Sequence, residues 1–120
     1  MQRAYRLRTS ADFQRVRARK RSLANSLLVL NTAPNELEHP RLGISVSRRV
    51  GKAVVRNRVR RRIREAVRQR LPELGQGCDL VFVARAPSAA AEWPALRGAV
   101  DELLRRARLT SSASRAVDGG

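Results

Sequence analysis

The chain has 120 residues, of which 26 are lysine or arginine and 10 are aspartate or glutamate, so its formal net charge is +16. This length suits one domain, and a hydrophobic content of 42% supports a modest core, which argues against a wholly disordered basic tail. No apolar run approaches the ~20 residues of a membrane span, no secretory signal is evident, and the single cysteine, Cys78, cannot form an internal disulfide, so we expect a cytoplasmic protein.

The N-terminal third predicts one helix and then two strands. Thr9 or Ser10 can cap a short helix whose apolar side includes Phe13 and Val16, and residues 17–21 form a basic connector. Residues 26–32 are typical of a buried strand, and residues 42–46 alternate between apolar and small residues as a second strand does. Because the intervening loop is short, we expect these two strands to pair as an antiparallel hairpin.

A long helix is predicted from about residue 53 to Pro72. Its apolar positions recur at i, i+4, i+8, i+11 and i+12, and they are Val55, Val59, Ile63, Ala66 and Val67. The opposite face collects Asn57, Arg60, Arg61, Arg64 and Arg68. This helix therefore has a core side and a cationic side.

The rest of the chain predicts a third strand over residues 79–84 and a last amphipathic helix behind Trp93 and Pro94. The expected fold is α+β: a small, mainly antiparallel sheet packed with helices, in the order helix-strand-strand-helix-strand-helix. We expect a single RNA-binding domain over residues 1–109 and a flexible C-terminal tail over residues 110–120.

The positive charge is concentrated, which favours binding to nucleic acid over a solvated surface. Residues 41–70 carry 12 basic side chains and one acidic side chain, and the stretch 56–64 has six arginines and no acid. Such a face can contact successive phosphates and release counterions. RNA is favoured over DNA, because a strand precedes the basic helix where a helix-turn-helix motif would need another helix.

Catalysis by the protein alone has little support in the sequence. The one histidine, His39, lies beside Pro40 in a predicted turn, the acids are scattered, and no glycine-rich phosphate loop is evident. We therefore expect no catalytic residue and no metal ligand in the chain.

Two adjoining motifs resemble the protein subunit of bacterial ribonuclease P. Residues 43–53, GISVSRRVGKA, form a Gly-x-Ser-Val-Ser-basic-basic strand, and residues 54–66, VVRNRVRRRIREA, contain an Arg-Asn-Arg core in a basic helix. The first helix, the strand ending at Ala86 and the last helix also follow the family's order, so the similarity covers roughly residues 5–109. In the fold, the resemblance implies a left-handed crossover, an exception to the usual hand.

In function, the resemblance implies a non-catalytic component of an endoribonuclease whose chemistry belongs to a partner RNA. The protein would bind that catalytic RNA and the 5′ leader of precursor tRNA, assisting endonucleolytic 5′ maturation. Mg²⁺ would be bound chiefly by the RNA, with no cofactor in the protein alone, no membrane association and no protein partner required. The alternatives are a structural RNA-binding protein, such as a ribosomal component, and a stand-alone nuclease.

The family pattern also assigns residues. RNA binding is expected from Arg48, Arg49, Lys52, Arg56, Asn57, Arg58, Arg60, Arg61, Arg64 and Arg68. The leader cleft is expected at Phe13, Arg17 and Asn31, although some family members carry aromatics at the positions of Arg17 and Asn31. Asn57 has a second interpretation as a helix-start cap. Arg62 lies near the edge of the apolar face and is interpreted as a structural residue.

Overall fold

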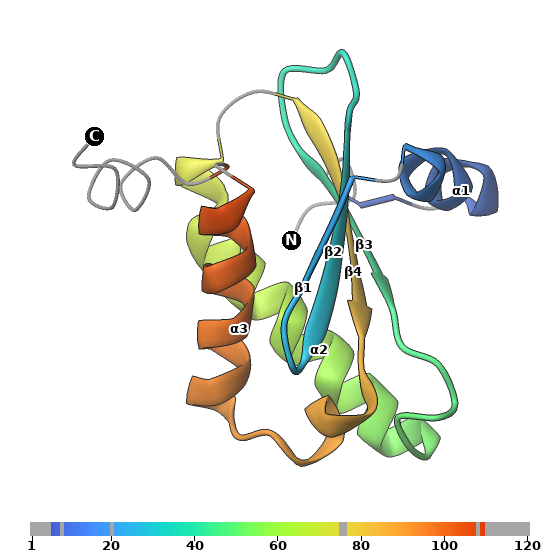
Figure 1. Ribbon diagram of the computed structural model, residues 1–120, viewed down its shortest axis with the longest axis vertical. Helices are drawn as coiled ribbons and strands as arrows, with labels where there is room; N and C mark the ends of the chain where they lie inside the picture. Colours follow the sequence, from blue (N-terminus) through green and yellow to red (C-terminus); the bar gives the residue numbers. More distant parts are fainter. Residues whose placement is uncertain (1–5, 8, 20, 75–76, 108, 110–120) are drawn as a thin grey trace.

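A computed structural model describes residues 6–7, 9–19, 21–74, 77–107 and 109, and within them the chain forms three layers (Figure 1). A four-stranded sheet is the middle layer. Helix α1 (Ser10–Ala18) covers one face, and helices α2 (Ala53–Arg70) and α3 (Trp93–Arg106) cover the other. The α+β class and the mainly antiparallel sheet are confirmed.

The strand order differs from the expected hairpin. The strands are β1 (Ser22–Ala24), β2 (Leu28–Pro34), β3 (Arg41–Ser45) and β4 (Cys78–Ala84), and they lie in the order β1-β2-β4-β3. Strand β4 runs antiparallel to β2 and parallel to β3, so the predicted direct pairing of β2 with β3 is wrong. The apolar run of β4 explains this order, because a strand that is buried on both faces is best satisfied with a neighbour on each edge.

The sequence pattern did not predict strand β1. It is only three residues long, pairs antiparallel with β2, and forms an edge of the sheet. A segment this short carries no readable alternation, so its pairing depends on the apolar strand beside it.

The helices begin and end close to the predicted positions. The Asp12 backbone N–H donates to Thr9 Oγ1 at 3.1 Å, which makes Thr9 the cap of α1. Helix α2 gives way to the 3-10 turn η2 (Leu71–Glu73) at Pro72, and a second turn, η3 (Ala86–Ala90), leads into α3. None of the described helices is both long and apolar enough to cross a membrane.

Alternation along the strands divides the buried side chains into two clusters. Leu28, Leu30 and Phe82 face α2 and α3 in the larger cluster. Ala33 and Val81 face α1, and they pack with Val16 in the smaller one. The β3-α2-β4 segment is the crossover whose left hand stays a prediction, and the tail predicted for residues 110–120 lies outside the described residues.

Candidate nucleic-acid interface

Burial of one side of α2 turns its cationic side outward. Val59, Ile63, Ala66 and Val67 are buried against the sheet and α3, as the periodicity predicted. The residues on the opposite side, which we call the outward face of α2, are Asn57, Arg60, Arg61, Arg64 and Arg68. The packing of α2 therefore holds these side chains along one side of a rigid element.

Asn57 does not cap the helix, which corrects the second interpretation of this residue. Helix α2 begins at Ala53, its N-cap residue is Lys52, and Asn57 lies one turn inside. Its Oδ1 instead accepts a hydrogen bond from the Arg60 guanidinium at 2.8 Å. This bond orients Arg60 on the outward face, because the two residues are three apart and neighbours on a helix.

Arg64 lies close enough to two other arginines to feel their charge. Its side chain is partly covered, and burial, followed by the charges of Arg6 and Arg60, lowers the pKa of Arg64 from its ordinary value. Arg6 reaches this position because it forms a parallel bridge beside Leu42 of β3. Three guanidinium groups from two distant segments thus repel one another, and a bound anion would relieve that repulsion.

Three other arginines of α2 lie at its margins and bond to backbone carbonyls. Arg56 donates to the carbonyl of Gly51 at 3.1 Å, which ties the start of α2 to the preceding loop. Arg58 and Arg62 donate to the carbonyls of Ala89 and Ala91 at 3.2 and 3.1 Å. Arg62 therefore has a structural contact, as expected, and Arg56 and Arg58 combine such a contact with their charge.

Arg68 shares its charge with an acid on the same helix. Its Nε donates to Glu65 Oε1 at 2.9 Å, and this contact raises the pKa of Arg68 and lowers that of Glu65. Both side chains are about half exposed, so the pair contributes little to stability. Of the residues on the outward face, Arg68 has the most strongly neutralised charge.

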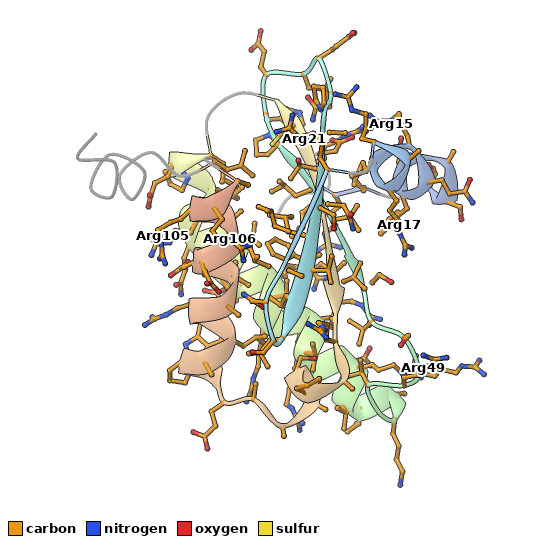
Figure 2. All side chains as sticks on the ribbon, viewed as in Figure 1. Arg15, Arg17, Arg21, Arg49, Arg105 and Arg106 are labelled. Atoms are coloured by element: carbon orange, nitrogen blue, oxygen red, sulfur yellow. The ribbon has the colours of Figure 1, made fainter. Side chains whose placement is uncertain are left out.

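The loop between β3 and α2 presents three further cations. Val46 and Val50 are buried and anchor the loop, and the Val50 backbone N–H donates to the carbonyl of Ser47 at 3.0 Å. Arg48, Arg49 and Lys52 are exposed in between. Figure 2 shows Arg49 extending from this loop on the side of the sheet that carries α1, where Arg17 also lies.

The three residues expected in the leader cleft share one face of the sheet. Phe13 and Arg17 lie on α1 and line a shallow hollow with Thr9. Asn31 alternates with the core-facing residues of β2, so it belongs to the face that α1 covers, and its side chain is largely buried at 8% exposure.

Phe13 packs against Gly43 of β3, which has no side chain to displace the ring. A Cβ atom on Gly43 of β3 would lie 2.5 Å from the Phe13 ring, closer than carbon atoms can approach. The glycine of the Gly-x-Ser-Val-Ser motif therefore lets the aromatic ring rest on the sheet.

Asp79 holds α1 against the sheet, a role that sequence reasoning missed. Its buried carboxylate accepts two hydrogen bonds from Arg41 at 2.9 and 3.0 Å, one from Asn35 at 2.8 Å, and one from Arg15 of α1. Burial by itself would raise the pKa of Asp79, but these hydrogen bonds, Arg41 first, hold it below its ordinary value. An acid at the start of an otherwise apolar strand was the signal in the sequence.

A family model, related sequences and solved structures all match this chain to ribonuclease P proteins. The family model for ribonuclease P matches residues 1–108. The ribonuclease P protein component of Roseiflexus castenholzii is 48% identical over 114 residues, covering 94% of this chain and 93% of the relative. That of Caldanaerobacter subterraneus is 37% identical over 103 residues, covering 86% of this chain and 89% of the relative.

Two solved structures resemble this fold throughout. The RNase P protein of Staphylococcus aureus is 34% identical, with a TM-score of 0.84 and coverage of 91% of this chain and 100% of that one. The RNase P protein of Thermotoga maritima is 31% identical, with a TM-score of 0.77 and coverage of 84% and 96%.

Proposed function

This chain belongs to the ribonuclease P protein family, and from that premise we propose how its surfaces serve the protein component of ribonuclease P. As that component it assists 5′ maturation of tRNA together with an RNA subunit, which is the catalytic part of the endoribonuclease. Catalysis by the RNA subunit agrees with the protein sequence, which is rich in basic residues and has no clear candidate for a general acid or base.

The outward face of α2, extended by Arg48, Arg49 and Lys52, binds the catalytic RNA in this proposal. The observation that carries it is the burial of the apolar side of α2, which holds Arg60, Arg61 and Arg64 on the opposite side of the helix. Burial, followed by the charges of Arg6 and Arg60, also lowers the pKa of Arg64. Phosphates placed beside these guanidiniums would replace repulsion with charge-assisted hydrogen bonds. Arg56 and Arg58 contribute from the margins of the helix.

The hollow beside α1 binds the 5′ leader of precursor tRNA. Phe13 supplies an aromatic edge and Arg17 a cation, and both lie on the sheet face to which Asn31 belongs. With a single aromatic residue among the three, contact with the leader depends more on charge and hydrogen bonding than on stacking.

Mg²⁺ in the complex is held chiefly by the RNA. The basic surface supports this assignment, because guanidinium groups repel a divalent cation that phosphate oxygens attract. Among the described residues, no group of three or more histidines, cysteines, aspartates and glutamates could hold a metal ion. The protein needs no further protein partner, and it acts in the cytoplasm.

The test is cleavage of a precursor tRNA at low Mg²⁺ by the cognate catalytic RNA, with and without the protein. We expect correct 5′ cleavage to increase when the protein is added, and to increase much less with the double variant Arg60→Ala, Arg64→Ala. The matched control is Arg105→Ala, an exposed arginine at the far end of α3 (Figure 2). Tight, salt-sensitive RNA binding without stimulation would instead indicate a structural RNA-binding protein.

A further inference from the structure

A groove beside α2 combines arginines with the one tryptophan of the chain. Its lining residues, which we call the tryptophan groove, are Arg58, Arg61, Arg62 and Glu65 of α2 and the segment 89–94, which runs from the end of η3 to the start of α3. Its larger part is an open hollow with a volume of about 530 Å³. None of these residues was assigned a leader-binding role, and the groove lies on the opposite sheet face from α1.

Trp93 presents part of its indole to this groove. It is the first residue of α3, where Pro94 follows it, and it is only partly buried against the main core. The same residue lines both parts of the groove. An indole that is held on one side by the core and open on the other offers a fixed stacking surface for a planar base.

The guanidinium groups opposite Trp93 are already held in place. Arg58 and Arg62 each donate one hydrogen bond to a backbone carbonyl of the facing segment, that of Ala89 at 3.2 Å and that of Ala91 at 3.1 Å. A guanidinium carries five N–H donors, so one such bond leaves capacity for a phosphate. Less side-chain entropy is lost on binding when these groups are fixed beforehand.

The acids in the groove do not cancel this charge. Glu65 is bound by Arg68, which lies outside the groove, and Glu92 is exposed and lines the larger part beside Trp93, so three arginines face two acids of which one is already paired. Arg61 is exposed and belongs both to the groove and to the outward face of α2. Arg61 therefore connects the outward face of α2 with the groove that Trp93 lines.

We propose that the tryptophan groove binds an unpaired nucleotide of RNA, with its base stacked on Trp93 and its phosphates bound by Arg58 and Arg61. The site rests on the proposed function, because it extends the RNA-binding face of α2 around the helix. Single-stranded RNA fits better than a duplex, since only an unpaired base can leave its stack to cover an indole.

The test uses Trp93 as its own reporter, since it is the chain's one tryptophan. The full chain is titrated with a short oligouridylate while tryptophan emission and the anisotropy of an end-labelled oligouridylate are followed. We expect emission to be quenched in step with binding, and Arg61→Gln to weaken both by about five- to tenfold, the effect of losing one charge-assisted contact. Arg105→Gln is the matched control and should change neither.

Two further measurements separate stacking from charge. Inorganic polyphosphate should compete for the protein without quenching Trp93, because it has no base to stack. Trp93→Leu should weaken oligouridylate binding by about five-fold or more while Trp93→Phe retains most of it, since a phenyl ring still stacks; thermal unfolding checks that both variants fold. Binding without quenching, or equal quenching by polyphosphate, overturns the groove assignment. The salt dependence of the Arg60, Arg64 double variant reports separately on the face of α2.

Discussion

Replacing Asp79 by asparagine should destabilise the protein strongly. The carboxylate is fully buried and accepts four hydrogen bonds, from Arg41, Asn35 and Arg15. Asp79→Asn keeps the shape but removes the charge and places an N–H₂ group against guanidinium donors. Breaking a buried ion pair from one side costs about 3–5 kcal/mol. That is a large part of a total stability of about 5–15 kcal/mol.

Urea denaturation monitored by circular dichroism measures this loss. With an m-value of about 1.5 kcal/mol/M, the midpoint should fall by about 2–3 M urea. Asp12→Asn is the matched control, because its carboxylate lies 3.9 Å from the same Arg41 but is 28% exposed. It should cost less than about 1 kcal/mol. A similar, small loss in both variants would refute the assignment of Asp79 as the anchor of α1.

The pH dependence gives a second measure of the same anchor. Hydrogen bonds overcome the opposing effect of burial and hold the pKa of Asp79 below its ordinary value. Its contribution is therefore fully present above the unfolded aspartate pKa of about 3.9, and it is lost as the pH falls through the lower folded pKa. The parent should lose more stability than Asp79→Asn on acidification below about pH 4. Parallel stability curves for the two proteins would contradict this reasoning.

Three further results are expected. The double variant Arg60→Ala, Arg64→Ala should lower RNA affinity and reduce the slope of log K against log salt by about two, with little change in thermal stability; an unchanged slope argues against phosphate contact. Phe13→Ala should weaken binding of leader-containing precursor more than binding of mature tRNA, whereas an equal loss would make Phe13 a core residue. Burial first, and then Asp79, raises the pKa of Cys78 to about 11, so Ellman's reagent at pH 8 should modify the folded protein far more slowly than the urea-unfolded one.

The outward face of α2 was predictable because helical periodicity is a local property. The spacing of Val59, Ile63 and Val67 determines which side of the helix is buried, and the arginines between them then face outward. The family resemblance depended on the same segment and the strand before it. The neighbourhood of Arg6 and Arg64 was not predictable, because it arises from a bridge between the N-terminal segment and β3.

Sequence by itself determined the three helices, three of the four strands and the cationic side of α2, since each follows from periodicity, capping or local charge. Tertiary structure decided the rest. The insertion of β4 between β2 and β3, the burial of Asp79 among residues from three other segments, and the meeting of Trp93 with Arg58 all join positions far apart in the chain. Such contacts depend on which apolar faces can be buried together, and no local pattern records that choice.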